Sequence, residues 1–445
     1  MREGSLEAPT RHSIPWQDES WLDPAAIDAE LRRVFDICHG CRRCFNLCDS
    51  FPRLFDLIDA SQTGELDAVD SADFQPVIEA CTLCDMCFMT KCPYVPPHAF
   101  DLDFPHLMLR ARAAEAHRLG VLDRRLAATD SMGALGSLAA PLANWVLRRG
   151  NAVTRPILEK VVGFDREAEL PRYESQRFTI AARSSPPAVN RAAPAAGRKV
   201  VLFATCWVNN NDAAIGHAAL GVLARNGIKA EVLHPGCCGM PLLEQGRMAD
   251  VAAAAERAAA AFAPWIEQGY DIVAPIPSCG LMLKFEWPLM LPRHEGVRKL
   301  ASATFDICEY VVDIAKKEGL APGLSPLPGG VSVHMACHAR AQNMGQKAAE
   351  MLRLVPEAEI GVVERCSGHG GSWGFRKENF SVAMKVGRPA ARTLREAGKP
   401  VATSECPLAA MHLGQAMQRL GGDAAVPEVV SHPIILMARA YGIEV

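Results

Sequence analysis

Short apolar runs alternate with helical patterns through the second half of this sequence. Residues 199–206 (KVVLFATC) form an aliphatic run that ends at Cys206, and a helical pattern with a glycine stop follows it. Two further runs, AEVLHPGCCG and DIVAPIPSC, contain the Cys237–Cys238 pair and Cys279 at their ends. Strands that alternate with helices are typical of a parallel sheet. The pattern therefore predicts a β-α-β-α-β unit over residues 198–325.

The same pattern recurs in residues 326–445. The runs VSVHMACHAR, IGVVERCSGHGG and PVATSECPLAAM place Cys337, Cys366 and Cys406 at offsets of 131, 129 and 127 residues from the cysteines of the first unit. Chance rarely preserves three such offsets, so we predict a duplicated domain. The predicted fold class is α/β, with two tandem β-α-β-α-β cysteine-rich repeats in the C-terminal half. We name them repeat one (198–325) and repeat two (326–445).

The first half of the sequence shows helical patterns. FPRLFDLIDA is one such segment, and PHLMLRARAAEAHRLG is another, with proline at its start and glycine past its end. We expect a polar tail over residues 1–30, a helical domain over 31–120, a helical connector over 121–182 and a Pro/Ala/Ser-rich linker over 183–197.

Composition indicates the cellular compartment of the protein and the kinds of partner it binds. The formal net charge of −3 lacks the basic balance of a nucleic-acid-binding protein, so no nucleic-acid partner is expected. The opening MREGSLEAPTRHS has no apolar stretch, from which we expect no secretory signal and a cytoplasmic protein. The run MGALGSLAAPLANWVL has 16 residues and is short for a spanning helix. It predicts either a packed connector or a segment that docks peripherally at the inner face of the membrane or on a membrane subunit.

Cysteine is the most informative residue type, with 16 in the chain. Clustered thiols in a reducing compartment indicate metal binding. Two N-terminal groups, CHGCRRCFNLC and CTLCDMCFMTKCP, each have three cysteines at two-residue gaps and a fourth beyond them. Such a loop presents three thiolates to one iron–sulfur cluster, and the fourth cysteine usually reaches the other cluster of a pair. We assign Cys38, Cys41, Cys44 and Cys92 to one [4Fe–4S] cluster, and Cys81, Cys84, Cys87 and Cys48 to a second.

Two features depart from the two-cluster pattern. The last gap of the second group is four residues rather than three, and Asp49 rather than proline follows Cys48. A pair of four-cysteine zinc sites is the alternative, because C-x2-C spacing alone also suits zinc. The repeated triple spacing favours iron–sulfur clusters. Residues 31–120 are therefore predicted to form a helical, ferredoxin-like domain.

The repeats hold the remaining candidate ligands. Repeat one has four cysteines just past its strands, which predict a further iron–sulfur cluster: Cys206, Cys237, Cys238 and Cys279. Repeat two has only three, Cys337, Cys366 and Cys406, with Ser367, His338 and His369 nearby as oxygen or nitrogen ligands. A fourth cluster, in repeat two, is left open. Cys308 lies in a helical pattern and predicts a buried structural thiol.

The duplicated C…CCG…C pattern behind a two-cluster domain resembles the cysteine-rich (CCG) proteins related to heterodisulfide reductase. The supporting stretches include CWVNNND, CCGMPLLEQG, PSCGLMLKFEWP and HPIILMARAYG, which resemble in particular the iron–sulfur subunits of anaerobic glycerol-3-phosphate dehydrogenases. The resemblance implies an electron-transfer subunit that accepts electrons from a separate flavoprotein dehydrogenase and passes them to quinone or another carrier. It also implies that the four repeat-one cysteines hold a cluster. Repeat two reads CSG where the family often has CCG, which puts disulfide-reductase chemistry in doubt.

Two function classes follow from these residues. The first is an electron relay with no catalysis by the chain alone. The second is a catalytic disulfide reductase, in which an iron without a cysteine ligand in repeat two binds substrate and His334, His338 or His369 serves as acid, base or ligand. The alternative for His334 and His338 is that they orient the backbone after a strand. The sequence shows no G-x-G-x-x-G fingerprint and no P-loop, so the flavin is expected on another subunit.

Overall fold

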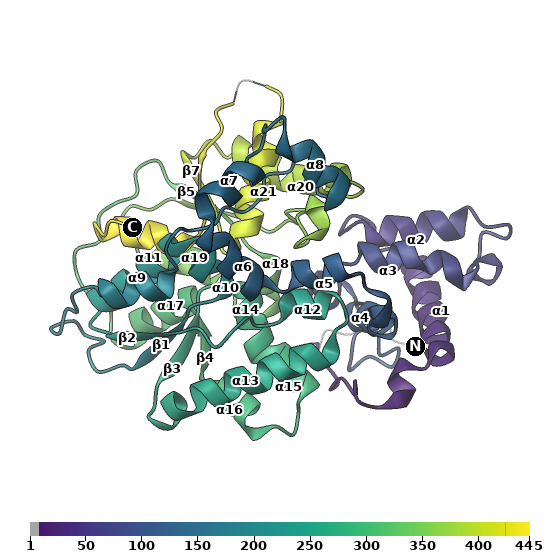
Figure 1. Cartoon of the computed structure of the whole chain (residues 1–445), viewed down its shortest axis with the longest axis horizontal. Helices are drawn as coiled ribbons and strands as arrows, with labels where there is room; N and C mark the ends of the chain where they lie inside the picture. The colour runs from purple at the N-terminus through teal and green to yellow at the C-terminus, as the bar shows by residue number, and fades with distance from the viewer. Residues whose placement is uncertain (1–8, 423) are drawn as a thin grey trace.

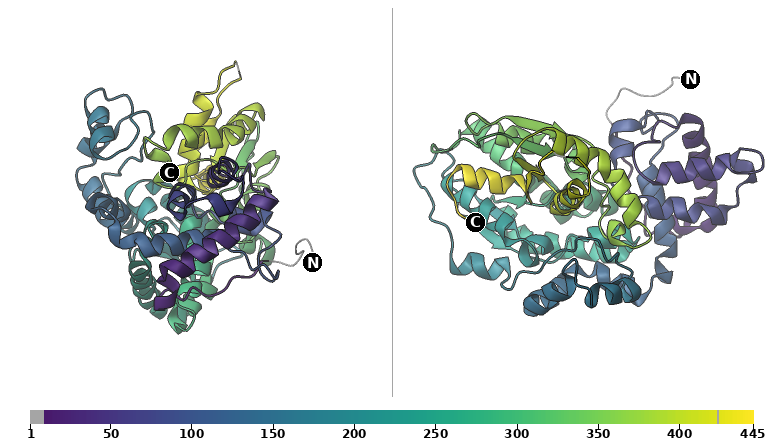
Figure 2. Two further views of the ribbon diagram at one scale, coloured as in Figure 1. Left: turned by 90° about the vertical axis from the view of Figure 1, so that its right-hand side faces the viewer. Right: turned by 90° about the horizontal axis from the view of Figure 1, so that it is seen from above.

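A computed structural model describes residues 9–422 and 424–445 of the chain, so residues 1–8 of the expected polar tail lie outside the described part. A helical N-terminal part projects to one side of a larger α/β body that holds both repeats (Figure 1). In Figure 2 the left view looks onto the N-terminal helices, in purple, in front of this body, and the right view shows them at one end of it.

The N-terminal part is built from helices around an aromatic core. Asp23 caps the first helix by accepting a hydrogen bond from the Ala26 N–H. The rings of Phe35 and Phe74 lie 5.0 Å apart, and this core supports the loops that carry the cysteines. The elements are η1 (Glu19–Leu22), α1 (Pro24–Cys41), α2 (Ser50–Asp59), η2 (Leu66–Ala68), η3 (Ser71–Phe74), α3 (Gln75–Ala80), η4 (Cys87–Lys91), α4 (Phe104–Glu115) and η5 (Ala116–Arg118).

The connector is helical and contacts both repeats. Its helices are α5 (Val121–Ala127), α6 (Thr129–Leu138), α7 (Ala140–Leu147), α8 (Thr154–Val161) and α9 (Phe178–Ser184). Helix α6 packs against α10 (Cys206–Asn210) of repeat one. Leu170 packs with Phe375 and Phe380 of repeat two. The connector therefore joins the two repeats along one side of the body.

Repeat one contains a parallel sheet, in which the strand order is β2-β1-β3-β4. The strands are β1 (Val200–Phe203), β2 (Ala230–Leu233), β3 (Asp271–Ala274) and β4 (Thr304–Asp306). The strand β1 is buried along its whole length, as is usual for the centre of a parallel sheet. Besides α10, the helices are α11 (Ala213–Arg225), α12 (Met240–Glu244), α13 (Met248–Glu267), α14 (Pro277–Leu281), η6 (Met282–Glu286), α15 (Trp287–Met290), α16 (Glu295–Ala303) and α17 (Ile307–Lys317).

Repeat two contains a second parallel sheet with the corresponding strand order, β6-β5-β7-β8. Its strands are β5 (Val331–His334), β6 (Ile360–Val363), β7 (Val401–Ser404) and β8 (Glu428–Val430). The first residue of the central strand pairs with the first residue of both neighbours in each sheet: Val200 with Ala230 and Asp271, and Val331 with Ile360 and Val401. The helices are α18 (Cys337–Ala341), α19 (Lys347–Leu352), η7 (Trp373–Phe375), α20 (Phe380–Glu396), α21 (Pro407–Gln418) and α22 (Pro433–Ala440).

The matching sheets confirm the α/β class and the tandem arrangement, but the β-α-β-α-β description is incomplete. Each sheet has a fourth parallel strand, β4 or β8, at its edge. Each of these strands has three residues, too few to show a periodicity. Cys308 lies in α17 and is fully buried, as the helical pattern predicts. The N-terminal part is helical, and its ferredoxin-like character stays a prediction.

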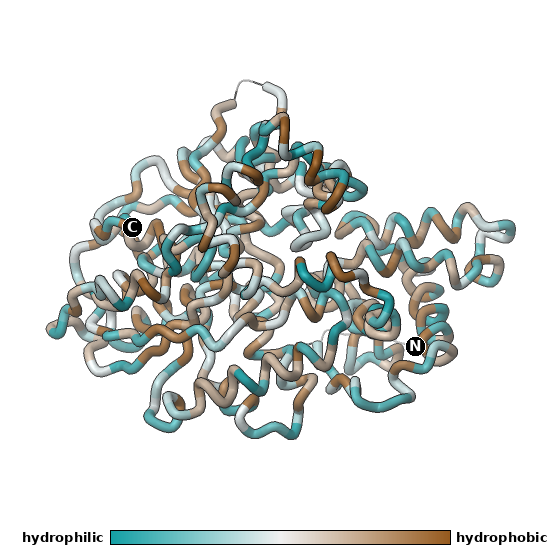
Figure 3. Tube along the Cα trace, in the orientation of Figure 1, coloured by the Kyte–Doolittle hydropathy of each residue, from teal (hydrophilic) through white to brown (hydrophobic). Residues whose placement is uncertain are grey.

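An apolar strip is exposed on the connector. Leu135, Leu138, Leu142 and Trp145 follow helical spacing along α6 and α7, and their side chains are 65%, 85%, 62% and 51% exposed. Figure 3 shows hydrophobic, brown segments in this region, at the upper middle of the view. No helix within residues 9–422 and 424–445 is long and apolar enough to cross a bilayer.

Candidate metal centres

The first group of N-terminal thiols gathers where α1 ends, and we call it the outer set: Cys38, Cys41, Cys44 and Cys92. Cys41 is the last residue of α1, and the next residue, Arg42, has a left-handed backbone with φ of 50° that turns the chain back. Burial, and then the charges of Cys92, Cys44 and Cys41, raise the pKa of the Cys38 thiol. These four thiols are therefore neighbours.

The second group, called the inner set, consists of Cys48, Cys81, Cys84 and Cys87. Burial, and then Cys84 and Cys81, raise the pKa of both the Cys48 and the Cys87 thiols. The residues on either side of Cys84 have left-handed backbones, with φ of 47° at Leu83 and 63° at Asp85. A left-handed residue other than glycine costs about 1–2 kcal/mol. Here the two left-handed residues turn the backbone on both sides of Cys84.

A buried ion cluster holds Asp85 in this turn. The Arg11 guanidinium lies 2.8 Å from Asp85 and 2.7 Å from Asp103, and 3.3 Å from Glu286 of η6 in repeat one. His106 Nε2 lies 3.2 Å from the same Glu286. Arg11 belongs to the segment that the sequence assigns to a polar tail, and in the structure it joins the N-terminal part to repeat one.

The repeat-one thiols lie past the carboxyl ends of β1, β2 and β3, as predicted. The Sγ atoms of Cys206 and Cys237 are 4.0 Å apart. Cys237 Sγ also accepts hydrogen bonds from the Thr129 hydroxyl at 3.2 Å and from the Gly239 N–H at 3.4 Å. The Cys206 and Cys238 thiols, followed by these donors, lower the pKa of Cys237. Gly239 has φ of 84°, a conformation that favours glycine and lets the doublet turn into α12.

The connector also places a second polar residue, Asp130, beside Cys237. The Asp130 carboxylate accepts a hydrogen bond from the Cys237 N–H, and its other oxygen lies 3.0 Å from His234 Nε2. Burial lowers the pKa of His234, but the hydrogen bond and charge of Asp130, together with the Ala204 carbonyl and the Cys237 thiolate, outweigh burial and raise it overall. No sequence pattern predicts functional side chains in the connector, whereas the structure places Thr129 and Asp130 directly on the doublet.

The thiols of repeat two have fewer hydrogen-bond donors at their sulfur atoms than Cys237 of repeat one. Cys366 Sγ accepts a hydrogen bond from the Gly368 N–H at 3.3 Å, and His369 Nε2 lies 3.7 Å from Cys406 Sγ. The Gly371 N–H donates to His369 Nδ1 at 2.9 Å. Because an accepting Nδ1 leaves the proton of a neutral imidazole on Nε2, His369 donates to the Cys406 sulfur in this arrangement. Burial lowers the pKa of His369 to about 3, which keeps the ring neutral.

The other two histidines singled out from the sequence have protein partners at both ring nitrogens. His334 Nδ1 lies 2.8 Å from the Ser404 hydroxyl, and its Nε2 donates to the Arg365 carbonyl at 2.9 Å. His338 makes the same kind of pair, with Ser278 at 2.8 Å and the Leu83 carbonyl at 3.3 Å. Both rings therefore hold neighbouring segments together.

The number of thiols in each group suits either an iron–sulfur cluster or a single zinc ion. Within the described part of the chain, no group of three or more His, Cys, Asp or Glu side chains is arranged to hold one metal ion. A single zinc ion draws four thiolates to about 2.3 Å from one centre. A [4Fe–4S] cluster holds them farther apart, because each thiolate binds a different iron. The outer set, the inner set and repeat one each have four thiols, which is the donor number of a [4Fe–4S] cluster and also of a four-cysteine zinc site.

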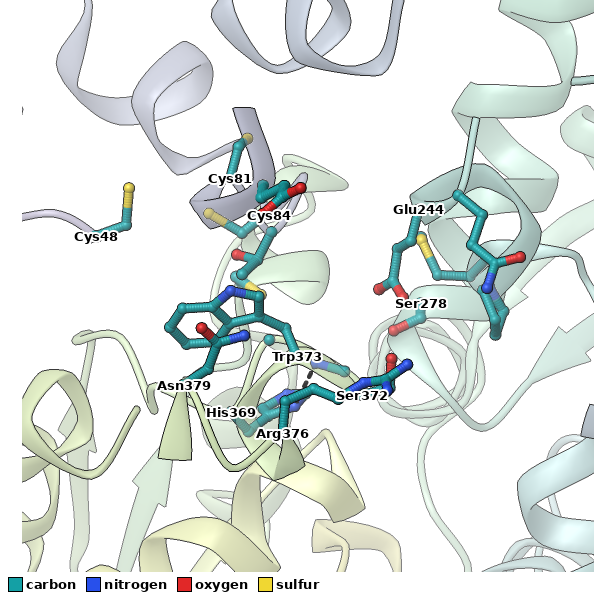
Figure 4. A pocket seen from close by; sticks show the side chains of 18 of the residues that line it. Cys48, Cys81, Cys84, Glu244, Ser278, His369, Ser372, Trp373, Arg376 and Asn379 are labelled. Atoms are coloured by element: carbon teal, nitrogen blue, oxygen red, sulfur yellow. Dashed lines mark hydrogen bonds between the residues drawn. The ribbon is translucent and has the colours of Figure 1, made fainter. Parts of the chain in front are cut away.

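A cavity of about 2690 Å³ lies between the N-terminal part, the connector and the two repeats. Thiols of the inner set and of both repeats line it, including Cys84, Cys237 and Cys366. Figure 4 shows Cys81 and Cys84 on one side, Glu244 and Ser278 on another, and Trp373 and His369 from repeat two below. Burial raises the pKa of the Glu244 carboxyl to about 7. No sequence signal points to Glu244, because its position depends on how the repeats pack.

Comparison with known proteins identifies the repeats. The model of the CCG cysteine-rich domain matches residues 200–284 and 331–414, so each repeat contains a domain of this kind. The chain is 26% identical over 352 residues to the C component of the anaerobic glycerol-3-phosphate dehydrogenase of Escherichia coli strain K12, which covers 76% of this chain and 82% of that relative. It is 28% identical over 195 residues to lactate utilization protein A of Bacillus velezensis, covering 42% of this chain and 79% of the relative.

Proposed function

We propose that this chain, with its two CCG cysteine-rich domains, is an iron–sulfur electron-transfer subunit of an oxidoreductase complex. The observation that carries the proposal is the meeting of thiols from the inner set and both repeats around one cavity, with the outer set adjoining the inner set. Centres placed side by side in this way pass electrons without a diffusing carrier. The similarity to a component of a dehydrogenase supports the same class of function.

The proposed cluster ligands are the thiols of the four groups. The outer and inner sets would each hold one [4Fe–4S] cluster, and Cys206, Cys237, Cys238 and Cys279 a third iron–sulfur cluster. Cys337, Cys366 and Cys406 supply three ligands for a fourth. When bound, such clusters supply one-electron redox chemistry. The protein positions them and adjusts their potentials through hydrogen bonds to sulfur, such as those from Thr129 and Gly239.

An electron-transfer subunit needs an electron donor and an electron acceptor. We infer that a separate flavoprotein dehydrogenase donates the electrons, because the sequence lacks a nucleotide-binding fingerprint of its own. The acceptor is a quinone or another carrier. We place the complex in the cytoplasm, at the inner face of the membrane.

The apolar strip (Leu135, Leu138, Leu142 and Trp145) is the proposed contact with the bilayer surface. The exposed Arg124, Arg125, Arg148 and Lys160 lie on the same connector and suit anionic lipids. Co-sedimentation of the full chain with vesicles containing anionic lipid tests this, with a Leu138→Asp/Leu142→Asp variant as the comparison. We expect the variant to lose most binding, and equal binding by both proteins would contradict the contact.

Metal analysis tests the main proposal directly. Anaerobically purified chain should contain about 12 irons and equal acid-labile sulfide with three clusters filled, and about 16 with four. The chain alone should not reduce a dye with glycerol 3-phosphate, and it should be reoxidised by a soluble quinone after chemical reduction. Zinc in place of iron, or substrate oxidation by the chain alone, would contradict the proposal.

One observation favours the second candidate, a disulfide reductase centred on repeat two. Ser367 takes the place of a cysteine and lines the cavity with Cys337, Cys366 and Cys406, so an iron held by these three thiols would lack a fourth thiolate. Reduction of a disulfide by the chemically reduced chain, lost in Cys406→Ser, would support that activity.

A further inference from the structure

A hydrogen-bonded bridge links three of the four thiol groups. Nε2 of His338 lies 3.3 Å from the Leu83 carbonyl oxygen, and its Nδ1 lies 2.8 Å from the Ser278 hydroxyl. Because a carbonyl only accepts, Nε2 carries the proton and Nδ1 accepts from Ser278. The ring is buried, so these partners also satisfy its two polar atoms.

Each member of the bridge is the chain neighbour of a cysteine from a different group. Leu83 precedes Cys84 of the inner set, Ser278 precedes Cys279 of repeat one, and His338 follows Cys337 of repeat two. One imidazole therefore fixes the backbone beside ligands of three centres. None of these contacts is local, since the residues are 60 and 255 positions apart in sequence.

The helices on which these residues lie pack directly against one another. Helix α14, with Ser278 and Cys279, contacts α18, which begins at Cys337. The buried Gln342 amide reinforces this contact by donating to the carbonyls of Pro277 and His338 at 3.1 and 3.2 Å. A Cβ on Gly280 would lie 3.0 Å from this amide nitrogen, so a glycine there permits the close approach.

The bridge itself gives the order of the groups. The His338 ring, which belongs to repeat two, contacts the Leu83 carbonyl beside Cys84 through Nε2 and the Ser278 hydroxyl beside Cys279 through Nδ1. Repeat two thus adjoins both the inner set and repeat one.

We propose that repeat two holds the middle redox centre of the chain, between the inner set and repeat one, and that His338 is the positioning residue that aligns all three. The inference rests on the proposed electron-transfer function and adds the order of the relay. With clusters bound, each step would move one electron from a reduced centre to its oxidised neighbour. No bond forms or breaks, and no proton moves through His338.

Freeze-quench EPR on the full chain, loaded anaerobically with iron and sulfide, tests the order. The chain is mixed with sub-stoichiometric dithionite, and Cys44→Ser, Cys366→Ser and Cys238→Ser variants assign the signals to their groups. We expect His338→Leu to slow redistribution of electrons between the groups at least tenfold with unchanged iron content. Ser278→Ala removes only the bond toward repeat one, and should slow only the step into that repeat.

The control is His217→Gln, which alters a half-buried histidine of repeat one that packs on Phe178. Unchanged redistribution in His338→Leu and Ser278→Ala, or normal transfer to repeat one in Cys366→Ser, would overturn the proposal. Hydrogen exchange of the metal-free chain provides an independent measurement. His338→Leu should raise amide exchange at residues 82–84 and 277–279, and unchanged exchange would refute the positioning role even if the clusters prove absent.

Discussion

The hydroxyl of Thr129, at the start of α6, donates a hydrogen bond to the Sγ of Cys237 at 3.2 Å. The two residues are 108 positions apart, and the contact brings the connector onto the CCG doublet of repeat one. Hydrogen bonds to a thiolate favour its charged form and, in a bound cluster, raise the reduction potential. Thr129 is thereby linked to the chemistry of a site in another part of the chain.

Thr129→Val should raise the pKa of Cys237 because it removes one donor to the sulfur. Alkylation of the metal-free chain across a pH series, read at Cys237 by mass spectrometry, measures this shift. Thr129→Ser keeps the donor and is the matched control. In the loaded chain, the same valine variant should lower the potential of the repeat-one cluster. An alkylation profile identical to that of the wild type would contradict the role of the hydroxyl.

Replacement of Cys238 by serine should remove one cluster, about four irons per chain. The reason is that Cys238 is one of only four thiols at the repeat-one site. The matched control is Cys308→Ala, which alters a buried cysteine of the same repeat that lies in α17. Iron content should be unchanged in the control. Equal iron in Cys238→Ser and the wild type would remove Cys238 from the ligand set.

Arg11→Ala should destabilise the chain by about 3–5 kcal/mol, because it leaves the buried carboxylates of Asp85 and Glu286 without their cation. Urea unfolding of the metal-free chain, followed by circular dichroism, measures the change. Arg33→Ala is the control, since Arg33 pairs with Glu30 at the surface and exposed pairs contribute about 0–1 kcal/mol. If the two variants lost similar unfolding free energy, the Arg11 cluster would contribute no more to stability than an exposed ion pair.

The same ion cluster predicts a pH dependence. Burial raises the pKa of Asp103 and Glu286, but the charge of His106 and then that of Arg11 outweigh burial and lower it overall. Burial and Arg11 lower the pKa of His106, whereas Asp103 and Glu286 outweigh them and raise it overall. The carboxylates therefore stabilise the fold above an ordinary pKa of about 4, and lose this effect as pH falls. Protonated His106 stabilises it fully below about pH 6.5, and loses this effect as pH rises through the raised pKa.

His106→Gln measures that window. The difference in unfolding free energy between this variant and the wild type should be largest between about pH 4.5 and 6.5, and should shrink on both sides. The exposed His117 provides the control, His117→Gln, which should show no such maximum. A difference that is constant from pH 4 to pH 9 would contradict the ionic role of His106.

Much of the architecture was predictable from local sequence. Alternating strand and helix patterns, repeated at an offset near 130 residues, predicted the parallel sheets and the positions past a strand of the seven candidate ligand cysteines of the repeats. The grouping of Cys38 with Cys92, and of Cys48 with Cys84, followed from spacing. The edge strands β4 and β8 were missed because three residues carry no usable periodicity.

The sequence by itself determined the thiol groups, the duplication and the fold class, because spacing and periodicity are properties of neighbouring residues. Only the tertiary structure decided which residues of the three parts of the chain come into contact. Only it placed Thr129 on Cys237, Arg11 among the carboxylates of two domains, and His338 between Leu83 and Ser278. These contacts join residues between 60 and 275 positions apart. They arise from the packing of whole domains, which no local pattern records.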